Sequence, residues 1–220
     1  MAMSGQPPLR VCREDMAFFG KIGADVSHEM RNVLAIVGEN AGLLDDQISL
    51  AERGTALDGE KLKKLSARIT RQITRGIQTM ERFSRFAHAA FEEAASSDLT
   101  ALTKTVAALA ERHVVLACCT LETDIPDKPI PVKANPFSLQ HAVFSAIELI
   151  LESLEDGQVL TIKLAGRGAT AVIAVSGNAA DTGELSGRMS RLSAVISELE
   201  GSVETSWEDG VLTLTLTIPA

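Results

Sequence analysis

The sequence has few cysteines, no apolar run long enough to cross a bilayer, and no repeated or low-complexity segment. A membrane-spanning helix needs about 18 or more apolar residues in a row, so none is expected. The first ten residues also lack the apolar core of a signal peptide, and we expect a cytoplasmic protein. Three cysteines, two of them the neighbours Cys118 and Cys119, predict neither a disulfide framework nor a metal site.

Basic residues are in the minority, with 21 Lys and Arg against 29 Asp and Glu. Residues 1–95 contain 13 of each sign, whereas residues 96–220 contain 8 basic and 16 acidic residues. The formal charge of −8 therefore lies in the second part of the chain. Because an acidic surface repels polyphosphates, duplex DNA and RNA are not expected partners. The 45% of hydrophobic residues over 220 positions suffices for a core and one further unit.

Two stripes of apolar residues, with members three or four positions apart, predict two long helices between residues 14 and 95. A segment with two glycines, residues 52–59, separates them and predicts the turn of an antiparallel hairpin. One hairpin buries two such stripes poorly, so we expect a homodimer in which two copies form a four-helix bundle. The stripes are Phe19, Ile22, Val26, Met30, Val33, Val37, Ala41, Leu44 and Ile48, then Leu62, Leu65, Ile69, Ile73, Gly76, Met80, Phe83 and Ala87.

The second part of the chain alternates between helical and strand-like patterns, which predicts an α+β protein whose hairpin precedes an α/β sandwich with a mixed sheet. Residues 1–13 are expected to be a tail, 14–95 the hairpin domain and 96–220 the sandwich domain. Residues 94–98 resemble a linker, in which Ser97 or Asp98 caps the next helix. Pro136 is expected at the first helical position. The predicted helices are 99–112, 137–154 and 185–199, and the predicted strands are 114–122, 159–164, 170–176, 202–207 and 211–218.

The segment from Ser27 to Asn32, Ser-His-Glu-Met-Arg-Asn, carries the most information about chemistry. His28 is two residues from Val26 and two from Met30, so it points away from the apolar stripe and is expected to be exposed. A neutral imidazole is a nucleophile toward phosphorus, and the adjacent Glu29 could orient it or accept its proton.

Four more side chains are expected around this imidazole at helical spacing. Ala24 and Ala35 are small enough to let another protein approach, and Arg31 could contact that protein. Asn32 could hydrogen-bond a phosphoryl oxygen or an attacking water. The alternative is an ordinary solvated histidine. A zinc site is disfavoured because Asn32 stands where the second imidazole of a His-Glu-x-x-His motif would be.

The Ser-His-Glu-x-Arg-Asn segment at the start of a helical hairpin resembles the phosphoacceptor box of two-component sensor histidine kinases. The resemblance covers nearly the whole chain from about residue 14. It implies that His28 is the phosphoacceptor, that Glu29 is its acid or base, and that Asn32 occupies the position used for receiver dephosphorylation. The implied partners are response-regulator receiver domains, which carry the phosphoryl group on an aspartate and supply Mg²⁺ themselves.

In that family the sandwich binds ATP, and here the nucleotide positions depart from the pattern. Ser145 and Leu149 stand where two asparagines are expected, and a leucine is no ligand for a hard cation. Residues 176–178, Ser-Gly-Asn, stand where Asp-x-Gly is expected, and one glycine remains in residues 186–189 where a Gly-x-Gly loop is expected. We therefore expect no ATP binding and no other cofactor in this chain. The pattern resembles the kinase-like histidine phosphotransferases, which pass phosphate between receivers.

The second predicted helix also carries a basic face, which could steer a transferring phosphate or could be an ordinary solvated face. Arg75 and Arg31 are the expected partner-binding arginines. Whether the chain is an enzyme is left open by the sequence. Two alternatives remain: an active kinase or receiver phosphatase with an unusual nucleotide site, and a non-catalytic module that sequesters a kinase or regulator. The basic face consists of Lys64, Arg68, Arg71, Arg75, Arg82 and Arg85.

Overall fold

A computed structural model describes residues 13–91, 96–179 and 185–220, except for the side chains of residues 185–188. The chain divides into two compact units, Met1–Phe83 and Ser84–Ala220. In the described part of the chain, no helix combines the length and apolar character needed to cross a membrane.

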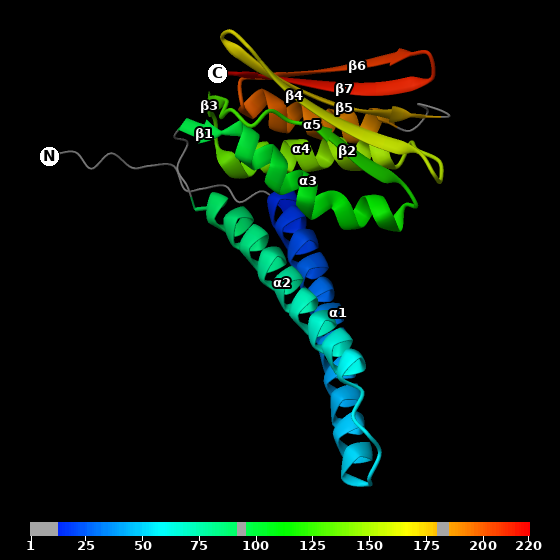
Figure 1. Ribbon diagram of the computed structural model, residues 1–220. Coiled ribbons are helices and arrows are strands. Elements are labelled where there is room, and N and C mark those ends of the chain that lie inside the picture. The colour runs from blue at the N-terminus through cyan, green and yellow to red at the C-terminus, as the bar shows by residue number, and fades with distance from the viewer. Residues whose placement is uncertain (1–12, 92–95, 180–184) are drawn as a thin grey trace, which may run out of the picture. The chain divides into compact units, whose positions relative to one another are not determined.

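The first unit is the predicted antiparallel helical hairpin (Figure 1). Helix α1 spans Arg13–Glu52, and helix α2 spans Gly59–Ala89, so α2 continues past the end of this unit. Asp58 caps α2, because its Oδ1 accepts hydrogen bonds from the backbone N–H groups of Glu60 and Lys61 at 3.0 and 3.1 Å. Ile22, Val26 and Val33 of the first predicted stripe and Leu65 of the second are buried, whereas Ile48, Ile73 and Met80 are exposed.

The second unit is a sandwich in which a mixed sheet is covered by helices on one face (Figure 1). The sheet order is β2-β4-β5-β7-β6, and β2 is parallel to β4 while the other neighbours are antiparallel. This arrangement confirms the predicted fold class. The strands are β2 (Thr120–Asp124), β4 (Val159–Arg167), β5 (Thr170–Asn178), β6 (Ser202–Glu208) and β7 (Val211–Pro219), and the helices are α3 (Leu99–Leu116), α4 (Pro136–Leu151) and α5 (Leu185–Glu198).

Alternation along the central strands explains why this sheet is covered on one face. In β7 every second residue from Leu212 to Ile218 is buried, and the threonines between them are partly exposed. The turn between β6 and β7 is an Asp-Gly pair between the two predicted strands, with positive φ values of 52° at Asp209 and 80° at Gly210. Two consecutive positive φ angles suit a two-residue hairpin, which fixes the register of the last two strands.

The predicted boundary between the 99–112 helix and the 114–122 strand is wrong. Residues Val114 to Leu116 belong to α3, and the strand β2 starts only at Thr120. The helix ends in a Schellman arrangement, in which Cys118 N–H bonds to Val115 O and Cys119 N–H bonds to Val114 O. Cys118 adopts φ 53° to make this turn. The adjacent β-branched valines suggested a strand, but tertiary packing keeps Val114 in the helix with 1% of its surface exposed.

The predicted linker 94–98 is partly wrong as well. Residues 94 and 95 lie outside the described residues, but Ser96–Asp98 forms strand β1, which pairs with β3 (Pro131–Lys133). Neither short strand was expected, because three residues are too few to show alternation. Asp98 does cap α3, and Asn135 caps α4 with Pro136 at its first position, as predicted. Helix α4 ends at Leu151, three residues before its predicted end.

Candidate functional site around His28

His28 lies in the middle of α1 with its side chain exposed. Its expected surface neighbours Ala24, Arg31, Asn32 and Ala35 are exposed too. The continuous α-helix from residue 13 to residue 52 therefore presents the imidazole on an outer face bordered by two alanines. On α1, the residues of this face are therefore accessible to a second protein.

One partner of the imidazole is Asn32, one helical turn along the chain. Asn32 Nδ2 lies 3.3 Å from His28 Nδ1. When the amide donates to Nδ1, the proton of the neutral ring resides on Nε2. When the amide is turned so that Oδ1 faces the ring, Nδ1 carries the proton and the Nε2 lone pair is free. Asn32 is thus placed to influence which ring nitrogen is nucleophilic, a contact that its i+4 spacing from His28 made foreseeable.

Glu29 is held by the opposite helix. The Oε1 atom of Glu29 lies 2.7 Å from Nη2 of Arg75 on α2. The glutamate side chain is only 16% exposed, whereas the arginine is 61% exposed. From the sequence, Arg75 is expected to bind a partner and Glu29 to act on the imidazole, and the structure brings these two side chains together.

The helices approach each other closely beside this ion pair. Gly76 follows Arg75 and is buried, and a Cβ atom at position 76 would lie 3.1 Å from Val33 Cγ1 and 3.3 Å from Met30 Cε. Such distances are tighter than ordinary van der Waals contact, so glycine is what lets α2 lie this near to α1. This close approach keeps Arg75 within reach of Glu29.

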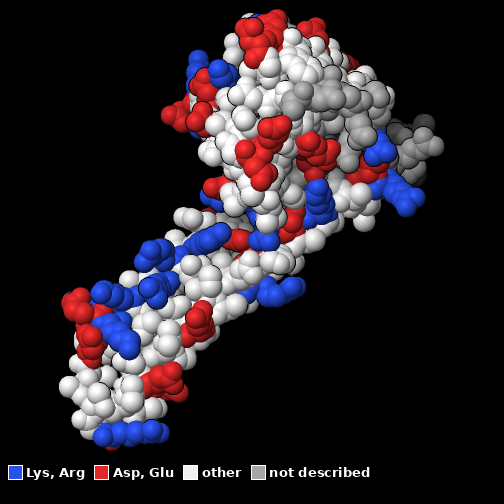
Figure 2. Space-filling view, turned by 90° about the vertical axis from the view of Figure 1, so that its right-hand side faces the viewer, with Lys and Arg blue, Asp and Glu red and all other residues white. Residues whose placement is uncertain are grey.

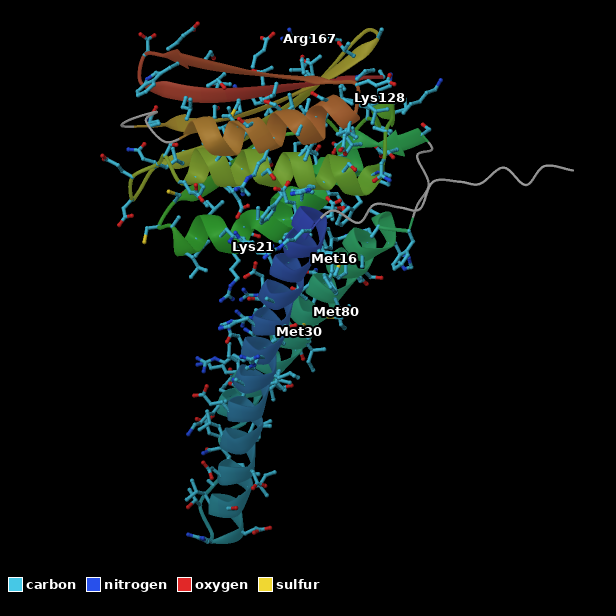
Figure 3. The ribbon with its side chains drawn as sticks, turned by 180° about the vertical axis from the view of Figure 1, so that it is seen from behind. Met16, Lys21, Met30, Met80, Lys128 and Arg167 are labelled. Atoms are coloured by element: carbon cyan, nitrogen blue, oxygen red, sulfur yellow. The ribbon has the colours of Figure 1, made fainter. Side chains whose placement is uncertain are left out.

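An apolar groove runs between the helices, with a volume of about 590 Å³. Two of its members, Met30 on α1 and Met80 on α2, are labelled in Figure 3. Leu34 and Met80 are 64% and 45% exposed, which is unusual for large apolar side chains on a hairpin. Arg31, an expected partner-binding residue, also borders this groove. The apolar groove is lined by Gly23, Val26, Ser27, Met30, Arg31, Leu34, Met80 and Phe83.

A second groove between the helices is polar and has a volume of about 320 Å³. Figure 2 shows blue Lys and Arg side chains gathered along this hairpin. At the groove Asn40 is 4% exposed and donates from Nδ2 to Ile36 O at 2.7 Å, while its Oδ1 accepts no hydrogen bond in the described part of the chain. We call this the basic groove; its lining residues are Ile36, Glu39, Asn40, Leu43, Arg68, Arg71 and Gln72.

Neither Asn40 nor Gln72 is among the site residues expected from the sequence. A signal for Asn40 existed, because Val26, Val33 and Asn40 follow one another at intervals of seven residues, and a polar residue thus continues a buried heptad position. Gln72 similarly follows Leu65 by seven residues. The polar layer at this level of the hairpin was therefore readable from spacing.

The positions compared with a nucleotide site lie in the second unit. Leu149 is buried in α4, with 3% of its surface exposed, and Ser145 is partly exposed. Gly177 in β5 faces Leu154, whose Cδ2 would lie 2.6 Å from a Cβ atom placed at 177. Residues 181–183 and the side chains of residues 186–188 lie outside the described residues. The described part contains no group of three His, Cys, Asp or Glu side chains able to hold a metal ion.

No protein-family model and no curated protein matches this chain. Solved structures do. A histidine kinase from Burkholderia phymatum STM815 has a TM-score of 0.53 at 13% identity, and the match covers 91% of this chain and 97% of that chain. The catalytic domain of histidine kinase ThkA has a TM-score of 0.53 at 15% identity, over 58% of this chain and 97% of that chain. This chain has a histidine-kinase-like fold.

The second of these matches concerns a catalytic domain, and the cytoplasmic segment of histidine kinase QseC matches with a TM-score of 0.50 at 15% identity. That match covers 58% of this chain and 78% of that chain. At such identities the histidine-kinase-like fold is what the likeness establishes. The chemistry has to be argued from the residues of the His28 site.

Proposed function

We propose that this protein is a histidine phosphotransferase, which accepts a phosphoryl group on His28 from a receiver aspartate and passes it to another receiver. The observation that carries the proposal is the exposed imidazole of His28, with Asn32 at its Nδ1 atom, on the hairpin of a histidine-kinase-like fold. An exposed nucleophile on a rigid helix is accessible to an acceptor or donor group on a second protein.

In the forward step, the lone pair of the unprotonated ring nitrogen attacks phosphorus. The N–P bond forms, the P–O bond of the aspartyl phosphate breaks, and its electron pair leaves with the receiver's carboxylate. The reverse step returns the phosphoryl group to the aspartate of a second receiver, so no oxidant or nucleotide is consumed. Mg²⁺ bound to the receiver would offset the charge on the transferring group, and this chain would mainly supply position.

Asn32 and Glu29 have separate roles in this proposal. With its amide turned so that Oδ1 faces the ring, Asn32 would hold the proton on Nδ1 and leave Nε2 for attack. Glu29, adjacent to His28, would tune the charge around the imidazole. The same Asn32 amide could orient a water for dephosphorylation of a receiver.

We further propose that the protein is a homodimer joined through the apolar groove. Beyond the apolar groove, α2 exposes two more large apolar side chains, Ile73 and Ile77, which are 48% and 54% exposed. A second hairpin would remove these surfaces from water and complete a four-helix bundle. Arg31 at the border of this groove would then lie at the rim of the dimer contact.

The receiver domain would bind at the basic groove. Asn32, Ile36, Glu39 and Leu43 are spaced by four, three and four residues, so they share a face of α1 that starts at the His28 site. Ile36 is about 12 Å from His28 along the helix. Receiver active sites are carboxylate clusters, which Arg68 and Arg71 complement in charge.

We also infer that the chain does not phosphorylate itself from ATP. Leu149 is apolar and buried, and residues 176–178 contain no carboxylate to read an adenine amino group. These residues do not fit a magnesium nucleotide. The sandwich would then serve as a structural or docking domain.

The test uses purified full-length chain and a panel of purified receivers, each first labelled with ³²P on its aspartate. We expect acid-labile label to move to the chain, to be lost in His28→Gln, and to move onward to a second receiver. His28→Gln should still bind the labelled receiver. Sedimentation velocity of the same preparation should give the mass of a dimer.

The alternatives give different results. Label from [γ-³²P]ATP on the chain alone would replace this proposal by an active kinase. Receiver binding without any transfer, and pathway output unchanged in His28→Gln, would replace it by a sequestering module. A monomer in sedimentation would overturn the dimer and leave the phosphotransfer proposal to its own result.

A further inference from the structure

The ion pair between Arg75 and Glu29 joins the two helices directly beside the acceptor histidine. It differs from an ordinary surface salt bridge because the carboxylate side chain is 16% exposed. Exposed pairs contribute little, but a mostly buried carboxylate that loses its counter-charge remains in a poorly solvated place. The pair therefore fixes where the charge of Glu29 resides.

The location of that charge matters for an incoming phosphoryl group. Glu29 follows His28 in the chain, so an unpaired carboxylate there would repel an anion that approaches the imidazole. Arg75 both neutralises Glu29 and holds its Oε1 atom on the α2 side at 2.7 Å. The Nδ2 atom of Asn32 lies 3.3 Å from Nδ1 of the imidazole.

The backbone next to Arg75 supports a fixed geometry of the ion pair. Gly76, the residue after Arg75, permits the close approach of the helices against Val33 and Met30. An arginine also holds this contact in a fixed direction better than a lysine would, because its planar guanidinium presents several donors at once. The remaining donors of Arg75 stay available, since its side chain is 61% exposed.

We propose that Arg75 is a positioning residue, which holds Glu29 away from the acceptor imidazole and so keeps the His28 site receptive to a phosphoryl anion. This inference rests on the proposed function, because it assumes that His28 accepts phosphate. It replaces direct partner binding as the role expected for Arg75 from the sequence.

The test uses phosphoramidate, a small phosphodonor that needs neither receiver nor nucleotide. The lone pair of the ring nitrogen forms the N–P bond while the P–N bond of the donor breaks, and its electron pair leaves with ammonia, which takes up a proton. Labelling of His28 is followed by ³¹P NMR, and His28→Gln supplies the blank. We expect His28 to be labelled more slowly in Arg75→Gln than in the natural protein, by on the order of tenfold.

A double-variant comparison separates a positioning role from a direct one. In a Glu29→Gln background, Arg75→Gln should have no further effect, because the charge that Arg75 restrains is gone. Arg75→Lys keeps the charge but not the planar guanidinium, so it should recover only part of the rate. Arg53→Gln, in the turn between the helices, changes the charge of the hairpin equally and should leave the rate unchanged.

A spectroscopic readout accompanies the rate. Two-bond ¹H–¹⁵N correlation of the His28 ring reports how the proton is shared between Nδ1 and Nε2. The ¹⁵N shifts of the His28 ring should change in Arg75→Gln relative to the natural protein. The shifts of Glu29→Gln should be the same as those of the double variant. Unchanged rate and shifts in Arg75→Gln would overturn the inference, as would a full effect of Arg75→Gln in the Glu29→Gln background.

The two proposals fail in different ways. If the natural protein takes up no phosphoryl group on His28 from phosphoramidate or from any receiver, the proposed function fails. If the natural protein is labelled and Arg75→Gln behaves identically, only the role of Arg75 fails. Circular dichroism of each variant confirms that the helices are intact before the rates are compared.

Discussion

Asn32 Nδ2 lies 3.3 Å from His28 Nδ1, with one turn of α1 between the two residues. Both side chains belong to one helix, so their spacing is set by local helical geometry. The imidazole of His28 thereby has a partner supplied by its own helix.

Replacing Asn32 tests that contact. We expect Asn32→Leu to slow labelling of His28 by phosphoramidate by on the order of tenfold, because the ring loses the group that orients it. Gln78→Leu removes an exposed amide elsewhere on the hairpin and should leave the rate unchanged. Equal rates for Asn32→Leu and the natural protein would show that the contact does not govern the nucleophile.

The buried carbonyl of Asn40 predicts an unusual gain in stability. Asn40→Leu removes an acceptor that finds no donor among the described residues, so we expect the free energy of unfolding to rise by about 1–3 kcal/mol. Thermal unfolding followed at 222 nm measures the change. A fall in the midpoint would show that the Oδ1 atom of Asn40 is hydrogen-bonded in solution.

Gly201 lies where the chain enters β6, and a side chain there meets backbone. A Cβ atom at this position would be 2.5 Å from Thr217 O, so Gly201→Ala should destabilise the sandwich by about 1–3 kcal/mol. The single tryptophan, Trp207 on β6, reports unfolding of this unit by fluorescence. Gly20→Ala on α1, where nothing lies within 4 Å, should instead stabilise its helix by up to about 1 kcal/mol. A Gly201→Ala midpoint equal to that of the natural protein would contradict the close approach.

The adjacent cysteines should differ in reactivity. Burial raises the pKa of the Cys119 thiol above its usual value, whereas Cys118 is exposed. Because the thiolate is the reactive form, Cys119 should alkylate more slowly than Cys118 and require a higher pH. Iodoacetamide labelling over pH 7–10 in a Cys12→Ser background, read by peptide mass spectrometry, makes the comparison. Equal rates at the two positions across that range would refute it.

Much of the architecture could be predicted because periodicity reports burial. The apolar stripes anticipated α1 and α2 within a few residues, and the Asp209-Gly210 pair marked the last hairpin. The end of α3 could not be predicted in the same way. Val114 and Val115 favour a strand locally, and only packing and the turn at Cys118 keep Val114 helical.

The candidate site likewise has one part that the sequence predicts and one part that it does not. The exposure of His28 followed from its angle to the stripe on one helix, and its contact with Asn32 is a matter of spacing on that helix. The pairing of Glu29 with Arg75 depends on the register between two helices that are 46 positions apart at these residues. A pattern within one helix does not specify that register, so this ion pair could not be predicted from the sequence.

Gly76 has a consequence for which sequences can occupy this hairpin. Its backbone sits against Val33 and Met30 with no room for a branched side chain, and Arg75 is joined to it by one peptide bond. A larger residue at position 76 would therefore move the guanidinium along with the backbone. Deep mutational scanning should accordingly find position 76 as intolerant as positions that touch the imidazole, although a glycine has no chemistry of its own.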